Sequence, residues 1–168
     1  MRSRHAVRPL LVTVTVGLLA LGSFGTSTAL GSPSQCARGD LGIKPGASNG
    51  ALGTIENAMI LRNVSGSTCT LKGYPTLGRW SKIGRPLATK TVKKWSFQPK
   101  LVTLHPKDRA TFIMKWSDVE SGPRACPITP VLQTIAPGDS RPLIIRFSMQ
   151  VCRRTITVSP VEKGVHSP

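Results

Sequence analysis

The sequence is short of acidic residues, of helical pattern and of long apolar runs, and each shortage excludes a class of protein. Seven Asp and Glu stand against 23 Lys and Arg in 168 residues, which gives a formal net charge of +16 and favours anionic over cationic partners. No segment keeps a 3.6-residue apolar period, which argues against a helical bundle. No apolar run reaches the roughly 20 residues of a membrane-spanning helix, so we expect no transmembrane span.

Metal-binding and cofactor motifs are also scarce. The four cysteines contain no Cys-x-x-Cys pair, which argues against structural zinc. His105 and His166 have no cysteine or carboxylate at ligand spacing, and no Asp-rich calcium loop occurs. We therefore predict no metal, no cofactor and no enzymatic activity.

One sequence motif that is typical of catalytic sites does occur. It is Gly-x-Ser-x-Gly around Ser48, in GASNG (46–50). A hydrolase nucleophile of this kind lies between a strand and a helix, with an acid and then a histidine later in the chain. We interpret the stretch as a loop that follows Pro45, and no helical pattern comes after it. A serine hydrolase that uses Ser48 is therefore only a further alternative.

The N-terminus has the pattern of a cleavable secretory signal peptide. Three arginines precede an apolar segment that begins at Leu10, and small residues follow. Cleavage after Ala29 and cleavage after Gly31 both fit the small-residue rule. Removal of residues 1–31 takes away three positive charges and no acid. We predict a secreted protein, extracellular or associated with the cell envelope.

The rest of the chain reads as short strands separated by Pro, Gly, Asn and Asp. Apolar residues alternate with polar ones at Ile145, Phe147 and Met149, and a second apolar series runs through Phe112, Met114 and Trp116. This pattern predicts an antiparallel β-sandwich. The expected strands are 55–64, 69–73, 76–80, 88–97, 100–105, 110–116, 131–136, 142–152 and 155–161.

The domain organisation follows from this pattern. We predict a signal peptide (1–31), a Gly/Ser/Pro-rich lead-in (32–53), a β-sandwich domain (54–161) and a C-terminal tail (162–168). The heptapeptide CTLKGYP (69–75) suits a strand that enters a bend, because glycine allows unusual backbone angles and proline cannot continue the pairing. We interpret it as architecture and not as a catalytic or ligand-binding motif.

The segment NVSGSTCTLKGYPTL (63–77) resembles the Cys-Thr-Leu-x-Gly-Tyr-Pro signature of a family of secreted actinobacterial proteins known only as a domain of unknown function. The resemblance continues through LVTLHPKDRATFIMKW (101–116), Cys126 and VCRRTITVSPV (151–161). It implies an immunoglobulin-like β-sandwich, export and two disulfides, and it implies no established activity. Lys107 and Asp108 stand where the family favours glycine.

Four cysteines in an oxidising compartment predict two disulfides, with three possible connectivities. An antibody-type core bridge would place a tyrosine two residues before its second cysteine, and neither Cys126 nor Cys152 has one. Alternation along 142–152 puts Cys152 on the polar face of the strand. That position suits a disulfide to the loop at Cys126 better than a bridge through the core. Cys36 lies in a lead-in that has few apolar residues. A disulfide to the strand at Cys69 is therefore needed to order this segment. We predict Cys36–Cys69 and Cys126–Cys152.

The most informative feature is a stretch from Asn57 to Lys107 that has ten Lys and Arg and no acid. Lysines fall on both faces of 88–97, which predicts an edge strand or a protruding hairpin, and charged edges also discourage aggregation. Tryptophan among lysines suits stacking on polymers, although a solvated basic face with buried aromatics explains the same pattern. The candidate anion-binding residues are Lys82, Arg85, Lys90, Lys93, Lys94 and Trp95.

These observations predict a secreted, non-enzymatic β-sandwich module that binds anionic material through a basic face. Candidate partners are anionic cell-envelope polymers, lipid headgroups and extracellular nucleic acid. The alternative is a structural or adhesion module that docks another envelope protein.

Overall fold

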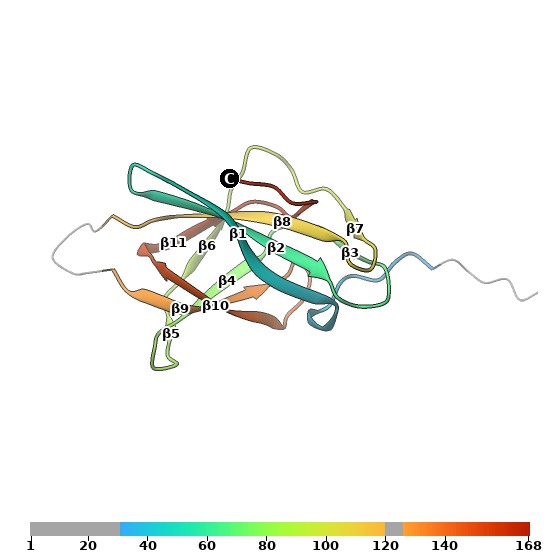
Figure 1. Cartoon of the computed structure of the whole chain (residues 1–168), viewed down its shortest axis with the longest axis horizontal. Coiled ribbons are helices and arrows are strands. Elements are labelled where there is room, and N and C mark those ends of the chain that lie inside the picture. The colour runs from blue at the N-terminus through green and yellow to red at the C-terminus, as the bar shows by residue number, and fades with distance from the viewer. Residues whose placement is uncertain (1–30, 120–125) are drawn as a thin grey trace, which may run out of the picture. The chain divides into compact units, whose positions relative to one another are not determined.

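The chain folds as two packed β-sheets accompanied by a short two-stranded ribbon (Figure 1). The structure is a computed structural model that describes residues 31–119 and 126–168. Except for Gly31, the predicted signal peptide (1–31) lies outside the described residues. In the parts of the chain that are described, no helix is long and apolar enough to cross a membrane.

The first sheet is six-stranded and carries the longest strands. Its path runs β1 (Leu41–Ala51), β2 (Thr54–Asn63), β8 (Arg109–Ser117), β11 (Cys152–Val158) and β6 (Lys90–Lys93), and β12 (Glu162–Lys163) also pairs with β8. All of its pairings are antiparallel except that of β11 with β6, which is parallel. The two edges of this path are therefore β1 and β6.

The second sheet is antiparallel and four-stranded. It runs β10 (Pro142–Gln150), β9 (Ile128–Ile135), β4 (Thr76–Trp80) and β5 (Pro86–Leu87). The ribbon pairs β3 (Cys69–Leu71) with β7 (Val102–Leu104), and a short 3-10 helix η1 covers Arg38–Asp40. Together these elements confirm the predicted all-β sandwich.

The core lies between the sheets and follows the predicted alternation. Phe112 and Met114 of β8 are fully buried, and Trp116 is nearly so. Across the core, the ring of Phe147 on β10 meets Trp116 edge to face, with ring centroids 6.4 Å apart. Such a pair adds roughly 0.5–1.5 kcal/mol beyond the area that it buries. The two strongest period-two series in the sequence thus face each other.

The predicted lead-in (32–53) is wrong in its second half, because residues 41–51 form β1 and belong to the sandwich. Strand β1 pairs with β2, and its register shifts between Pro45 and Ser48. An edge strand tolerates proline, since a missing N–H on its free side costs no ladder bond. GASNG (46–50) accordingly lies in a strand and not in a loop.

Part of the predicted C-terminal tail (162–168) also belongs to the six-stranded sheet. Glu162 and Lys163 form β12 opposite Thr111 and Ala110 of β8, and Val161 is buried. The Thr111 hydroxyl donates to the Gly164 carbonyl at 2.8 Å. This contact helps to explain why Thr111 is buried although it alternates with the core-facing residues of its strand.

The two disulfides join Cys36 to Cys69 and Cys126 to Cys152, as predicted. The N-terminal bridge lies beside backbone hydrogen bonds, because Cys36 N donates to Thr70 O and Thr70 N donates to Ser34 O, both at 2.9 Å. The second bridge has the predicted pairing, but Cys152 does not have the predicted position on its strand. Strand β10 ends at Gln150, and Cys152 begins β11 as a buried residue, so it does not lie on the polar face of a continuous strand.

Candidate anion-binding site

Five of the predicted anion-binding residues lie along one edge of the sandwich, which we call the basic edge. Lys82 and Arg85 are in the turn between β4 and β5, which projects from the sandwich (Figure 1). Lys90 and Lys93 are in β6, and Lys94 follows directly. All five side chains are exposed. The prediction that lysines mark an edge strand is confirmed, although β6 is shorter than the expected 88–97.

The chain at this edge is fixed by serine and threonine side chains. Arg85 N donates to Ser81 Oγ at 3.0 Å, and Ser81 N donates to Arg85 O at 2.8 Å. Leu77 N of β4 donates to Thr91 Oγ1 of β6 at 3.0 Å, which links the four-stranded sheet to the edge of the six-stranded sheet. The cations of the basic edge are therefore held on a defined backbone while their side chains remain in water.

The aromatic residues near the basic edge are only partly exposed. Trp95, Trp80 and Phe97 are all half-buried, so none is a fully exposed platform and none is fully buried. Trp95 follows Lys94 directly, just beyond β6. Stacking of a polymer on Trp95 therefore stays a prediction.

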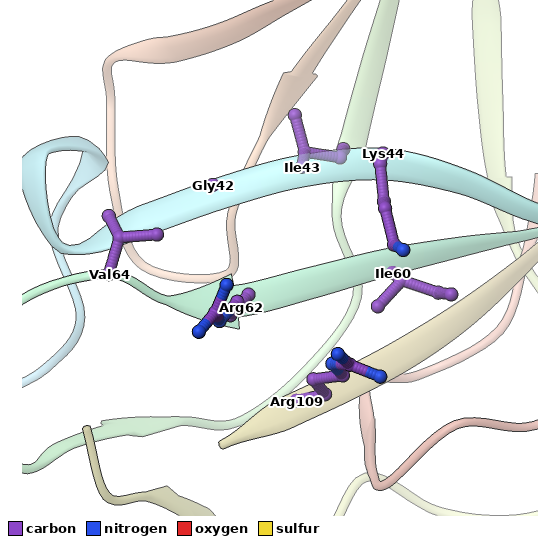
Figure 2. A pocket seen from close by; sticks show the side chains of 7 residues that line it. All are labelled: Gly42, Ile43, Lys44, Ile60, Arg62, Val64 and Arg109. Carbon is purple, nitrogen blue, oxygen red and sulfur yellow. The ribbon is translucent and has the colours of Figure 1, made fainter. Parts of the chain in front are cut away.

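A second group of cations lies on the outer face of the six-stranded sheet, around a hollow of about 190 Å³ (Figure 2). Lys44 of β1, Arg62 of β2 and Arg109 of β8 are its charged residues, and all three are exposed. Figure 2 shows the Lys44 amino group and the Arg109 guanidinium on either side of Ile60, with Arg62 farther along β2 toward Val64. We call this the cationic hollow; its lining residues are Gly42, Ile43, Lys44, Ile60, Arg62, Val64 and Arg109.

Strand register brings these residues together. Arg62 lies directly opposite Arg109 on one side and Gly42 on the other, while Ile60 lies opposite Lys44. Residues that face each other across paired strands share a face of the sheet, as do residues two apart on one strand. Since Met59 and Leu61 point into the core, Ile60 and Arg62 point outward.

The acidic residues nearest in sequence to the hollow form their ion pair and hydrogen bonds with groups outside it. Asp108 precedes Arg109, but its carboxylate lies 3.1 Å from Lys163 Nζ and accepts a hydrogen bond from His105 N. The hydrogen bond with Lys163, followed by that from His105, holds the Asp108 pKa below its usual value. Asp40 accepts a hydrogen bond from Ala37 N within η1. Neither acid forms a salt bridge with Arg62, Arg109 or Lys44.

Salt bridges are few on the described surface. The pairs found there are Lys115 with Glu56, Arg141 with Asp139 and Lys163 with Asp108. No salt bridge within residues 31–119 and 126–168 involves the basic edge or the cationic hollow. Both surfaces are thus open to an external anion.

Arg79 differs from these cations because it is buried. It occupies a core-facing position of β4 with 1% of its surface exposed. Its guanidinium donates to Ala88 O at 2.8 Å and to the hydroxyls of Thr89 and Thr129. Desolvation, and then the charge of Arg154, lower the Arg79 pKa. Arg79 therefore links the segment between β5 and β6 to β4 and β9 through hydrogen bonds. It does not face a ligand.

Sequence reasoning missed two members of the cationic hollow. Lys44 fell in the segment that we assigned to the lead-in, and Arg109 lies beyond the acid-free stretch, next to Asp108. No sequence signal links these residues; only the pairing of β2 with β1 and β8 places three outward cations within two rows of the sheet.

Ser48 has no catalytic surroundings of the expected kind. It lies on β1, and its hydroxyl donates to Glu56 O at 3.1 Å. A strand continues after it, so the strand-turn-helix geometry of a hydrolase nucleophile is not formed. The described residues also contain no group of three His, Cys, Asp or Glu that could hold a metal ion.

A comparison with protein families identifies a match. The model described as "Domain of unknown function (DUF4232)" matches residues 36–162, which is more than half of the chain. No curated protein and no solved structure matches the chain.

Proposed function

The chain belongs to the DUF4232 family of domains of unknown function, and we propose that it acts as an exported, non-enzymatic module that binds anionic polymers through the basic edge. The proposal includes the signal peptide (1–31), an actinobacterial source and the CTLKGYP signature. The oxidised pairing of all four cysteines supports export, because disulfides persist in oxidising compartments.

The observation that carries the proposal is the set of exposed, unpaired cations at the basic edge. Lys90, Lys93 and Lys94 lie close together in sequence on and just after an edge strand, and none takes part in a salt bridge among the described residues. A polyanion gains from such a surface because its binding releases condensed counterions. Phosphate-bearing envelope polymers, anionic lipid headgroups and nucleic acid all share this chemistry.

The alternative is that an edge of the sandwich docks another protein by strand pairing. Charged side chains on edge strands work against such pairing. Lysines occupy both ends of β6, which is the free edge on this side of the six-stranded sheet. The basic edge therefore favours polyanion binding over strand addition.

The test is retention on phosphocellulose, a phosphate-bearing matrix. The triple variant Lys90→Ser, Lys93→Ser, Lys94→Ser should elute at clearly lower salt than the parent protein. Its stability should change little, since exposed substitutions usually fall within about 0.5 kcal/mol.

A matched control removes the same charge elsewhere. Lys72, Lys100 and Lys107 are exposed and lie outside the basic edge. Their replacement by Ser should lower the eluting salt concentration less than the edge variant does. Equal elution of the two triple variants would show that net charge, and not the basic edge, governs retention.

A further inference from the structure

We infer that the cationic hollow is a specific binding site for a tetrahedral oxyanion, namely a phosphate or sulfate group. This site is separate from the basic edge and does not depend on the function proposed for that edge. Its charged residues are Lys44, Arg62 and Arg109.

Two like charges lie directly opposite each other in the strand register of the hollow. Arg62 and Arg109 are direct partners in the register of β2 and β8, and both side chains are on the outer face. Like charges directly opposite each other on antiparallel strands destabilise the pair. Lys44 adds a third positive charge one row away. An anion between these groups turns the repulsion into attraction, so the arrangement is stabilised by the ligand that it would bind.

The described residues supply no counter-ion to the cationic hollow. Asp108 is committed to Lys163 and Asp40 to the backbone of η1. None of the salt bridges in the described parts of the chain includes a cation of the hollow. The negative charge that this surface attracts must therefore come from solution.

The cationic hollow also has the space and the donor groups that a tetrahedral oxyanion needs. Gly42 lies opposite Arg62 and contributes no side chain to the hollow, where Val64 Cγ1 is its near neighbour. The hollow of about 190 Å³ is several times the roughly 30 Å³ that one water occupies in the liquid, which leaves room for a tetrahedral oxyanion. Two arginines provide planar donor forks that match two oxygens of such a group, and Lys44 provides a point charge.

The apolar lining indicates what is attached to the oxyanion. Ile60 is buried, with 7% of its surface exposed, whereas Val64 at the rim is 58% exposed. A free ion would leave Val64 in water, whereas the carbon atoms of a phosphate ester could cover it. We therefore expect an ester of phosphate to bind more tightly than the inorganic ion.

The experiment follows backbone amide shifts by NMR while the oxidised protein is titrated with inorganic phosphate at constant ionic strength. Saturable shifts should centre on Gly42, Arg62, Val64 and Arg109. Sulfate should shift the same amides, and dimethyl phosphate, a model phosphodiester, should do so at lower concentration. Equal binding of acetate, or shifts spread evenly over the basic edge, would overturn the site.

Two variants separate charge from shape. Arg62→Gln with Arg109→Gln should weaken phosphate binding by about tenfold or more, because charge-assisted hydrogen bonds are lost. Gly42→Val keeps every cation but fills the hollow, and it should weaken binding as well. A Cβ at Gly42 would lie 3.1 Å from Val64 Cγ1, so the added side chain meets another side chain at the rim and not the backbone.

The matched control is Lys90→Gln with Lys93→Gln, which removes two charges from the basic edge. Phosphate affinity at the hollow should stay within about twofold of the parent. An equal loss in this control would show that only net charge matters and would overturn the inference. If the double arginine variant does not fold, Gly42→Val decides, and normal phosphate binding by that variant would contradict the site.

The outcome is independent of the phosphocellulose experiment. Failure of the hollow leaves the effect of Lys90, Lys93 and Lys94 unchanged, and failure of the basic edge leaves the saturable shifts at Gly42 unchanged.

Discussion

Lys107 lies in the turn between β7 and β8 with a φ of 74°, a left-handed conformation that favours glycine. Pro106 precedes it, and Asp108 N donates to His105 O at 3.0 Å. Proline followed by a residue with positive φ is the pattern of a type II turn. Lys107 therefore occupies the third position of a type II turn, where glycine is usual.

Replacement of Lys107 by glycine should stabilise the protein by about 0.5 to 1 kcal/mol. The left-handed conformation costs a side-chain-bearing residue roughly 1–2 kcal/mol, which exceeds the entropic penalty of glycine, roughly 0.5–1 kcal/mol. Urea unfolding measures the difference. Lys107→Ala removes the same charge without relieving the backbone, so an equal gain in that variant would show that the strain argument is wrong.

At the scale of single elements, period-two alternation located strands well and composition located them poorly. The predicted strand 76–80 coincides with β4, and the inward residues of β8 and β10 were identified correctly. Strand β1 was missed because Pro45 and its neighbouring glycines read as a turn, and only pairing with β2 reveals that they continue a strand. Sequence indicates the face of a strand more readily than its partner.

The disulfide between Cys36 and Cys69 should be a major stabiliser of the N-terminal segment. Its cysteines are 33 residues apart, and closure of such a loop contributes very roughly 3 to 4 kcal/mol on the chain-entropy model. That is a large share of a typical stability of about 5–15 kcal/mol. The double variant Cys36→Ser, Cys69→Ser should show a correspondingly lower free energy of unfolding in urea.

Peptide mapping of the parent protein under non-reducing conditions provides a control that does not need the variant to fold. It should yield one species that links the Cys36 and Cys69 peptides and another that links the Cys126 and Cys152 peptides. A species that joins Cys69 to Cys126 or Cys152 would contradict the connectivity.

At the scale of the whole molecule, the two basic surfaces differ in how they arise. The basic edge is nearly continuous in sequence, so a count of charges between Asn57 and Lys107 was enough to predict it. The cationic hollow takes one cation from each of three strands, and residues 44 and 109 come together only through the shared partner β2. Sequence alone fixes no register, and so it could not identify the hollow.

Salt dependence tests whether these surfaces act on a polyanion. With duplex DNA as the probe, the logarithm of the binding constant should fall linearly with the logarithm of the salt concentration. The slope of that line should be about −0.9 for each phosphate that the protein neutralises. If Lys90, Lys93 and Lys94 each contact a phosphate, their replacement by serine should reduce the steepness by about 2 to 3. The Lys72, Lys100, Lys107 variant should keep a slope close to that of the parent. A parent slope near zero would instead favour the docking of another protein, because a packed interface between proteins releases few counterions.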